Sequence, residues 1–116
     1  MPGLSETIRA LAARSGVRRV VVASPDGLPV ESAGQQGDAE ALAALTSALI
    51  KPAERLAAEA GGPGLARAVL EFEGGFALLG AVRGGNWLVV LVSEAADVGD
   101  ILFELRQQGP ELAAQL

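Results

Sequence analysis

The sequence predicts an α/β (α+β) domain in which a five-stranded sheet lies between one long helix and two terminal helices. Three observations predict it: helix-like and strand-like apolar spacings alternate along the chain, glycine-rich turns separate them, and the strands differ in how many faces are apolar. The chain has 116 residues, half hydrophobic and 20% charged, which suffices for a buried core and excludes intrinsic disorder. We expect one domain over residues 1–110 and a short tail over 111–116.

The first third of the chain predicts a helix followed by a hairpin. Apolar residues at helical spacing favour a helix over 4–15. A nearly continuous β-branched run at 17–24 is typical of a buried strand. Turn residues at 24–27 then lead to a second strand at 28–32. Because Pro29 has no amide hydrogen to donate, this second strand belongs at a sheet edge.

A long helix is predicted to begin after Asp38, a residue type favoured at helix N-caps. Pro52 should bend this helix without ending it, and the glycines at 61–64 should end it. Four leucines recur at spacings of three, four or seven residues, so we expect them to face the sheet. They are Leu42, Leu45, Leu49 and Leu56.

Three strands and a final helix complete the predicted order α-β-β-α-β-β-β-α. The strands are expected at 66–73, 76–82 and 87–92, with Gly74-Gly75 and Gly84-Gly85 as turns. The strands at 17–24, 76–82 and 87–92 are apolar on both faces and therefore central, whereas the other two belong at the edges. This gives the order 2-1-5-4-3 in a mixed, mostly antiparallel sheet, with a parallel contact between the first and fifth strands.

The last helix is predicted to take Ser93 as its N-cap and to end at Gly109-Pro110. Its spacing indicates an inner apolar stripe of Val98, Ile101, Leu102 and Leu105. Its outer side carries acidic residues, which favours a solvated surface or, alternatively, a dock for a basic partner. These are Asp97, Asp100 and Glu104.

Composition excludes several classes of chemistry. The chain contains no Cys, His or Tyr, which removes thiolate and imidazole catalysis and the common zinc sites. Fourteen acidic residues against nine basic ones, with three Phe and one Trp, argue against nucleic-acid binding. No apolar run is long enough to span a membrane or act as a signal peptide. We therefore expect a cytoplasmic protein with no membrane insertion, catalytic residue, cofactor or metal; abundant Ala, Gly and Arg indicate a bacterial source.

Four motifs could carry chemistry, and each has a structural alternative that we favour. The glycine clusters are turns, because none leads from a strand into a helix with the Gly-Lys-Ser/Thr ending of a phosphate loop. Glu71 and Glu73 could share a divalent ion, but no third ligand is near and a solvated edge is favoured. Arg83 could act as an arginine finger, yet a loop arginine is usually only solvated. Trp87 is expected to pack in the core or between subunits.

Two surfaces are predicted to bind other chains. The outward face of the long helix is rich in small residues, which permit close approach by a partner; the alternative is an alanine-rich helix without such a role. The predicted partner-binding residues are Ala44, Ser47, Ala48, Lys51 and Arg55. The strand after the long helix lacks lysine, proline or a bulge to protect its edge, which predicts self-pairing into a homodimer. The predicted interface residues are Arg67, Val69, Glu71 and Glu73.

Over residues 4–106 the chain resembles the roadblock/dynein light chain family, and within it the bacterial MglB-type regulators. The similarity lies in the order of elements, the hairpin of residues 25–30, the capped helix from Asp38, and the strand of residues 87–92. The resemblance implies a homodimer that scaffolds or regulates a Ras-like small GTPase without catalysing a reaction itself. The alternative function is a binding module that senses a small metabolite.

Overall fold

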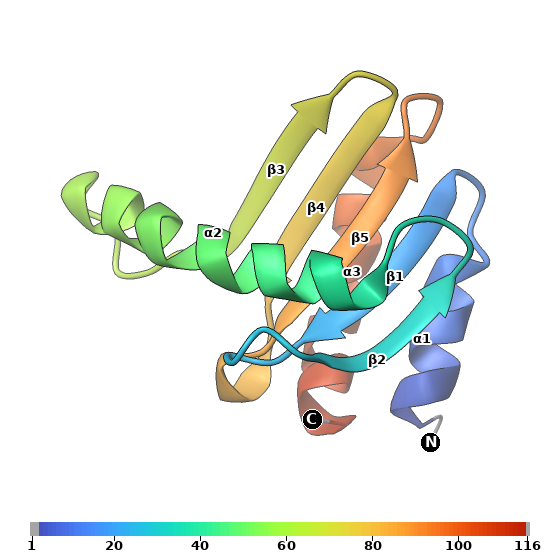
Figure 1. Cartoon of the computed structure of the whole chain (residues 1–116), viewed down its shortest axis with the longest axis horizontal. Helices are drawn as coiled ribbons and strands as arrows, with labels where there is room; N and C mark the ends of the chain where they lie inside the picture. The colour runs from blue at the N-terminus through green and yellow to red at the C-terminus, as the bar shows by residue number, and fades with distance from the viewer. Residues whose placement is uncertain (1–2, 116) are drawn as a thin grey trace.

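A computed structural model describes residues 3–115, and the side chains of residues 3–107. The observed order of elements is the predicted one (Figure 1). The elements are α1 (Leu4–Ala12), β1 (Val17–Ala23), β2 (Pro29–Gly34), α2 (Ala39–Glu59), β3 (Arg67–Phe72), β4 (Gly75–Ala81), the short 3-10 helix η1 (Arg83–Gly85), β5 (Trp87–Ser93) and α3 (Val98–Gln115).

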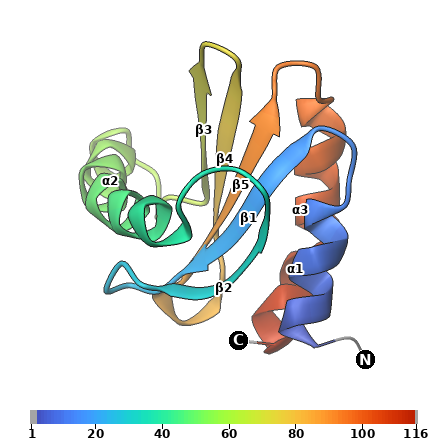
Figure 2. The same cartoon turned by 45° about the vertical axis from the view of Figure 1, so that its right-hand side comes forward.

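The sheet has the predicted strand order β2-β1-β5-β4-β3. Helix α2 lies on one face, and α1 and α3 lie on the other (Figure 2). The predicted parallel contact between the first and fifth strands is wrong, because β1 and β5 pair antiparallel. Hairpins fix strand directions only within each half of the sheet. Helix α2 acts as a crossover that makes the edge strands β2 and β3 parallel to each other, and this leaves β1 and β5 antiparallel.

The core has two layers, one on each face of the sheet. Val20 and Val22 of β1 pack towards α1 and α3, while Val21 and Ala23 pack towards α2. All four side chains are almost fully buried, as expected for a strand that is apolar on both faces. The predicted inner stripe of the last helix is also confirmed, because Ile101 and its neighbours Val98, Leu102 and Leu105 lie in or against the first layer.

The long helix begins and ends as the sequence predicts. The Asp38 carboxylate accepts a hydrogen bond from the Glu40 amide at 3.0 Å, which confirms it as the N-cap. The helix continues through Pro52 to Glu59. Beyond its end, Gly61 adopts a φ of 85°, a left-handed conformation that favours glycine.

The β3–β4 turn is one residue away from its predicted place. The two residues between the strands are Glu73 and Gly74, and Gly75 already pairs with Phe72 and Ser93 within the sheet. A Cβ at Gly75 would lie 2.2 Å from the Val92 carbonyl oxygen. The second glycine is therefore explained by this close approach of two backbones, and Glu73 belongs to the turn.

Both predicted ends of the last helix are also wrong. Ser93 ends β5, and Asp97 is the residue that caps α3, accepting a hydrogen bond from the Asp100 amide at 3.1 Å. The helix then continues past Pro110 to Gln115, so the predicted tail of 111–115 is helical; Leu116 lies outside the described residues. A proline inside a helix removes one backbone hydrogen bond, and α3 tolerates this as α2 does.

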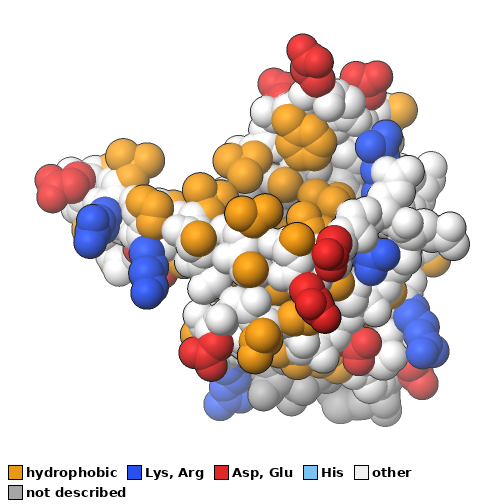
Figure 3. Space-filling model, viewed as in Figure 1, with side chains coloured by type: hydrophobic (Ala, Val, Ile, Leu, Met, Phe, Trp, Pro, Cys, Tyr) orange, Lys and Arg blue, Asp and Glu red, His pale blue; other side chains and the backbone are white. Residues whose placement is uncertain are grey.

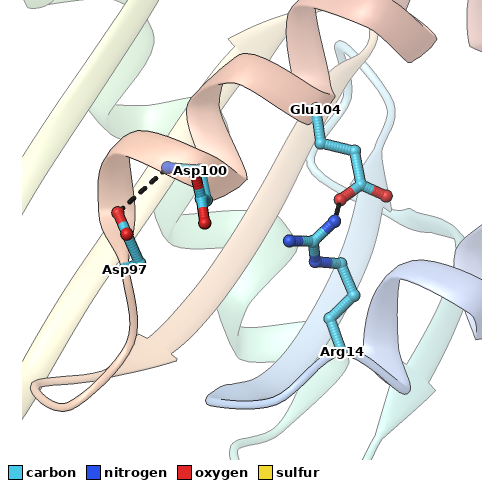
Figure 4. A network of polar contacts seen from close by, with 4 residues as sticks. All are labelled: Arg14, Asp97, Asp100 and Glu104. Atoms are coloured by element: carbon cyan, nitrogen blue, oxygen red, sulfur yellow. Dashed lines mark hydrogen bonds and ion pairs between the residues drawn. The ribbon is translucent and has the colours of Figure 1, made fainter.

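An ion pair joins the two terminal helices on the second face of the sheet. Arg14, just after α1, pairs with Glu104 of α3, beside the Asp97 cap (Figure 4). Of the three acidic residues that the sequence placed on the outer side of this helix, Glu104 is thus engaged by the ion pair and Asp97 by capping.

Replacing Arg19 by alanine should lower the free energy of unfolding by about 1–3 kcal/mol. Its guanidinium donates to the Ser32 hydroxyl at 2.8 Å and to the carbonyl oxygens of Gly34 and Gln36 at 3.2 and 2.5 Å, which ties β1 to the chain entering α2. Urea unfolding measures the loss. The exposed neighbour Arg18 is the control, and equal losses for Arg18→Ala and Arg19→Ala would contradict this role.

Candidate protein-interaction site

The face of α2 that packs on the sheet is not the leucine stripe. The buried residues are Ala43, Thr46 and Ile50, whereas Leu45 is 66% exposed and Leu56 is 73% exposed. The predicted inward orientation is therefore wrong for Leu45, Leu49 and Leu56, whereas Leu42 does pack against the core layer under α2. Small and β-branched side chains let the helix lie close to β1 and β5, and the leucines are turned towards β3 and β4.

An apolar groove of about 310 Å³ lies where α2 leaves the sheet uncovered. One wall is formed by leucines of α2 and the other by Leu70 and Phe72 of β3, which are both exposed. We call this feature, with both of its walls, the apolar groove. Figure 3 shows hydrophobic side chains gathered between α2 and β3. Its residues are Leu42, Leu45, Thr46, Leu49, Leu70, Phe72, Ala77, Leu79, Val89 and Leu91. Contiguous exposed apolar surface of this kind is typical of interaction sites on proteins.

The C-terminal half of α2 extends beyond the edge of the sheet. In Figures 1 and 2 this part of the helix projects past β3, so no strand of the chain lies beneath it. Leu56 lies in this half and is the most exposed of the four leucines named in the sequence. The projecting helix and the apolar groove thus form one continuous apolar region beside β3.

The free edge of β3 offers backbone groups at three predicted positions. The Ala81 amide donates to the Ala66 carbonyl at 3.0 Å, so these two residues form a hydrogen-bonded pair next to the β3–β4 ladder. Hydrogen-bonded and non-hydrogen-bonded residue pairs alternate along an antiparallel ladder. The backbone groups of Arg67, Val69 and Glu71 therefore point away from β4, towards solvent. Glu73 lies beyond the strand, in the turn.

The predicted partner-binding residues divide into two groups. Four of them are exposed on α2: Ala44, Ala48, Lys51 and Arg55. Ser47 is half-buried, and its hydroxyl donates to the Pro25 carbonyl at 3.0 Å. Its predicted outward orientation is wrong, because α2 docks against the β1–β2 turn through this side chain.

The other candidates from the sequence occupy ordinary positions. Arg83 is exposed in η1, and Trp87 is buried at the start of β5, within the core layer under α2. Among the described residues, no group of three or more Asp, Glu, His or Cys side chains could hold a metal ion. Within the same part of the chain, no helix has both the length and the apolar character needed to cross a bilayer.

The sequence prediction did not single out Leu70 and Phe72, which form one wall of the apolar groove, and it misplaced three of the four leucines. The available signal was the presence of two apolar stripes on α2, the leucines and the row of Ala43, Thr46 and Ile50. A helix with two apolar faces requires two apolar contacts. The fold provides only one of them.

The fold thus combines a five-stranded sheet of order β2-β1-β5-β4-β3 with one long helix on one face and two terminal helices on the other. The Roadblock/LC7 domain profile matches residues 4–92. The chain belongs to the Roadblock/LC7 family, which confirms the family predicted from the sequence. No curated protein matches the chain by sequence.

Solved structures share the fold over almost the entire chain. Myxococcus xanthus MglB superimposes with a TM-score of 0.87 at 20% identity, covering 96% of this chain and 85% of that one. A Roadblock/LC7 domain from Streptomyces avermitilis also gives 0.87, at 22% identity and 97% coverage of both chains. A second structure described as a Roadblock/LC7 domain from that organism gives 0.72 at 28% identity, with both chains fully covered.

Proposed function

We propose that the chain is a homodimer formed through β3 and the apolar groove. The observation that carries this proposal is the apolar region beside a free strand edge: the groove, the projecting half of α2 and the outward backbone groups of β3 all lie on one side of the molecule. A second copy related by a two-fold axis covers all three at once, whereas a different partner would need to match each of them separately.

The register of the proposed pairing follows from the free backbone groups. Antiparallel pairing centred on Val69 uses the amides of Arg67, Val69 and Glu71 and extends the sheet across both subunits. Arg67 then lies opposite Glu71 of the partner subunit, so opposite charges face each other. In this arrangement Glu73 sits at the periphery, and α2 of each subunit passes over the apolar groove of the other.

Multi-angle light scattering at tens of micromolar tests the dimer. We expect a mass of twice the 11.7 kDa of one chain. A mass of 11.7 kDa at that concentration would overturn the proposed interface.

We further propose that the dimer is a non-catalytic, cytoplasmic scaffold or regulator that binds a Ras-like small GTPase. Support comes from family membership and from the structural similarity to MglB, together with the exposed small residues on the outer face of α2. Ala44 and Ala48 permit close approach, and Lys51 and Arg55 supply charge at the rim. Any effect on GTP hydrolysis then arises from ordering the switch segments of the GTPase itself.

Ala48→Arg should weaken GTPase binding at least tenfold while leaving the dimer and its melting temperature unchanged. Ala48 lies on the side of α2 opposite the buried residues, so a long charged side chain there obstructs only an incoming partner. Isothermal titration calorimetry with a Ras-like GTPase measures the effect. Ala10→Arg, at an exposed position on α1, is the matched control, and undiminished binding by Ala48→Arg would place the docking surface elsewhere.

A further inference from the structure

A second pocket lies on the opposite flank of α2 from the apolar groove. Its volume is about 240 Å³, below the range of roughly 300 Å³ and above that holds drug-sized ligands. Successive turns of α2 form one wall, and the β1–β2 turn and the start of β5 form the others. We call it the Trp87 pocket. It is lined by Ala23, Ser24, Pro25, Thr46, Ser47, Ile50, Lys51, Glu54, Gly85 and Trp87.

The walls of the Trp87 pocket are held in place by hydrogen bonds within the chain. The Ser24 hydroxyl accepts from the Leu28 amide at 3.1 Å, and the Gly27 amide donates to the Ser24 carbonyl at 2.9 Å. The bond from Ser47 to the Pro25 carbonyl fixes this turn to α2. A pocket built in this way exists before a ligand arrives, so binding requires little reorganisation.

Two polar groups that line the pocket make no hydrogen bond within the described part of the chain. Thr46 is 5% exposed and Trp87 is 8% exposed, and neither the threonine hydroxyl nor the indole N–H makes a hydrogen bond to any described residue. Both atoms keep some contact with solvent, so water can satisfy them in the free pocket, and an acceptor group of a ligand can replace that water. Each can donate one hydrogen bond to a ligand.

Lys51 and Glu54 supply one positive and one negative charge at the pocket. They are exposed, lie on adjacent turns of α2, and form no ion pair with each other or with another described residue. Ala23, Ile50 and the Trp87 ring provide apolar surface between them. The lining therefore combines donors, a cation, an anion and an apolar wall within a small volume.

We propose that the Trp87 pocket binds a free α-amino acid with an apolar side chain. Its carboxylate accepts hydrogen bonds from Lys51, Thr46 and Trp87, its ammonium group pairs with Glu54, and its side chain packs against Ile50 and the indole ring. The combination of one cation and one anion favours a zwitterion over a simple carboxylate. The pocket lies on a different flank of α2 from the dimer interface. It shares Lys51 with the proposed GTPase-binding face, but its test uses the purified chain without a GTPase.

Intrinsic fluorescence tests this proposal directly, because Trp87 is the only tryptophan and the chain has no tyrosine. Titration of the purified chain with each of the common α-amino acids should give a saturable change for one or more apolar ones, with a Kd below about 1 mM. The corresponding amine and the corresponding carboxylic acid, each lacking one charge, should bind at least tenfold more weakly.

Lys51→Met and Glu54→Gln should each weaken amino-acid binding at least tenfold without changing the melting temperature, because both side chains are exposed. Glu59→Gln, at an exposed position on α2 outside the pocket, is the matched control and should bind normally. If none of the amino acids changes the fluorescence of Trp87, the pocket holds only water and the proposal is wrong. Equal binding of the carboxylic acid alone, or unaltered binding by both variants, would also overturn the proposal.

Discussion

Val69→Pro is expected to convert the dimer into a folded monomer. The Val69 amide points to the free edge of β3, and the proposed two-fold axis passes beside it, so one substitution removes two equivalent intersubunit hydrogen bonds. Each is worth about 0.5–1.5 kcal/mol net, which weakens the dimer roughly 10–100-fold before the clash of the proline ring is added. Sedimentation velocity at a series of concentrations measures the change.

Val69→Thr is the matched control for this substitution. Threonine is β-branched and keeps the amide hydrogen, so the variant should remain dimeric. Circular dichroism should show the same strand content for both variants. A Val69→Pro chain that stays dimeric would mean that the subunits associate without the β3 ladder.

Leu56→Glu should have an even larger effect on dimerisation. In the single chain Leu56 is 73% exposed, so a glutamate there leaves the fold intact. In the proposed dimer the projecting end of α2 lies over the partner subunit, and burying an unpaired carboxylate there costs several kcal/mol. The dissociation constant should rise on the order of 100-fold or more.

Leu28→Glu provides the comparison, because Leu28 is 64% exposed near the opposite edge of the sheet. This variant should dimerise like the parent chain. If Leu28→Glu dissociates the subunits and Leu56→Glu does not, the dimer forms through β2 instead of β3.

Most of the fold could be predicted from the sequence because its signals are local. β-branched runs, the Asp38 cap and the glycine turns each depend on a few neighbouring residues. Strands that are apolar on both faces can be assigned to the centre of the sheet. The direction of β1 relative to β5 could not be predicted in this way, because it depends on how a long crossover returns to the sheet. Gly75 misled the turn prediction for a similar reason, since the close contact with Val92 joins distant segments.

The candidate site was harder to predict because periodicity shows that a helix face is apolar but not what covers it. Leu45, Leu49 and Leu56 have the spacing of a core stripe, yet the chain buries Ala43, Thr46 and Ile50 and leaves these leucines exposed. Ser47 was misplaced as a consequence, because rotating the helix turns it towards Pro25. The edge position of β3, by contrast, was predictable from its one-sided pattern.

GTPase binding by the dimer is tested most directly by titrating it with a Ras-like small GTPase loaded with GDP or with a non-hydrolysable GTP analogue. We expect saturable binding with tighter affinity for the GTPase that carries the GTP analogue, and no GTP hydrolysis by the dimer alone. Arg83→Ala should leave any effect on hydrolysis unchanged, whereas loss of an arginine finger would cost on the order of 10³-fold or more. Absence of binding to the GTPase in both nucleotide states, or hydrolysis of GTP by this chain alone, would contradict the proposed function.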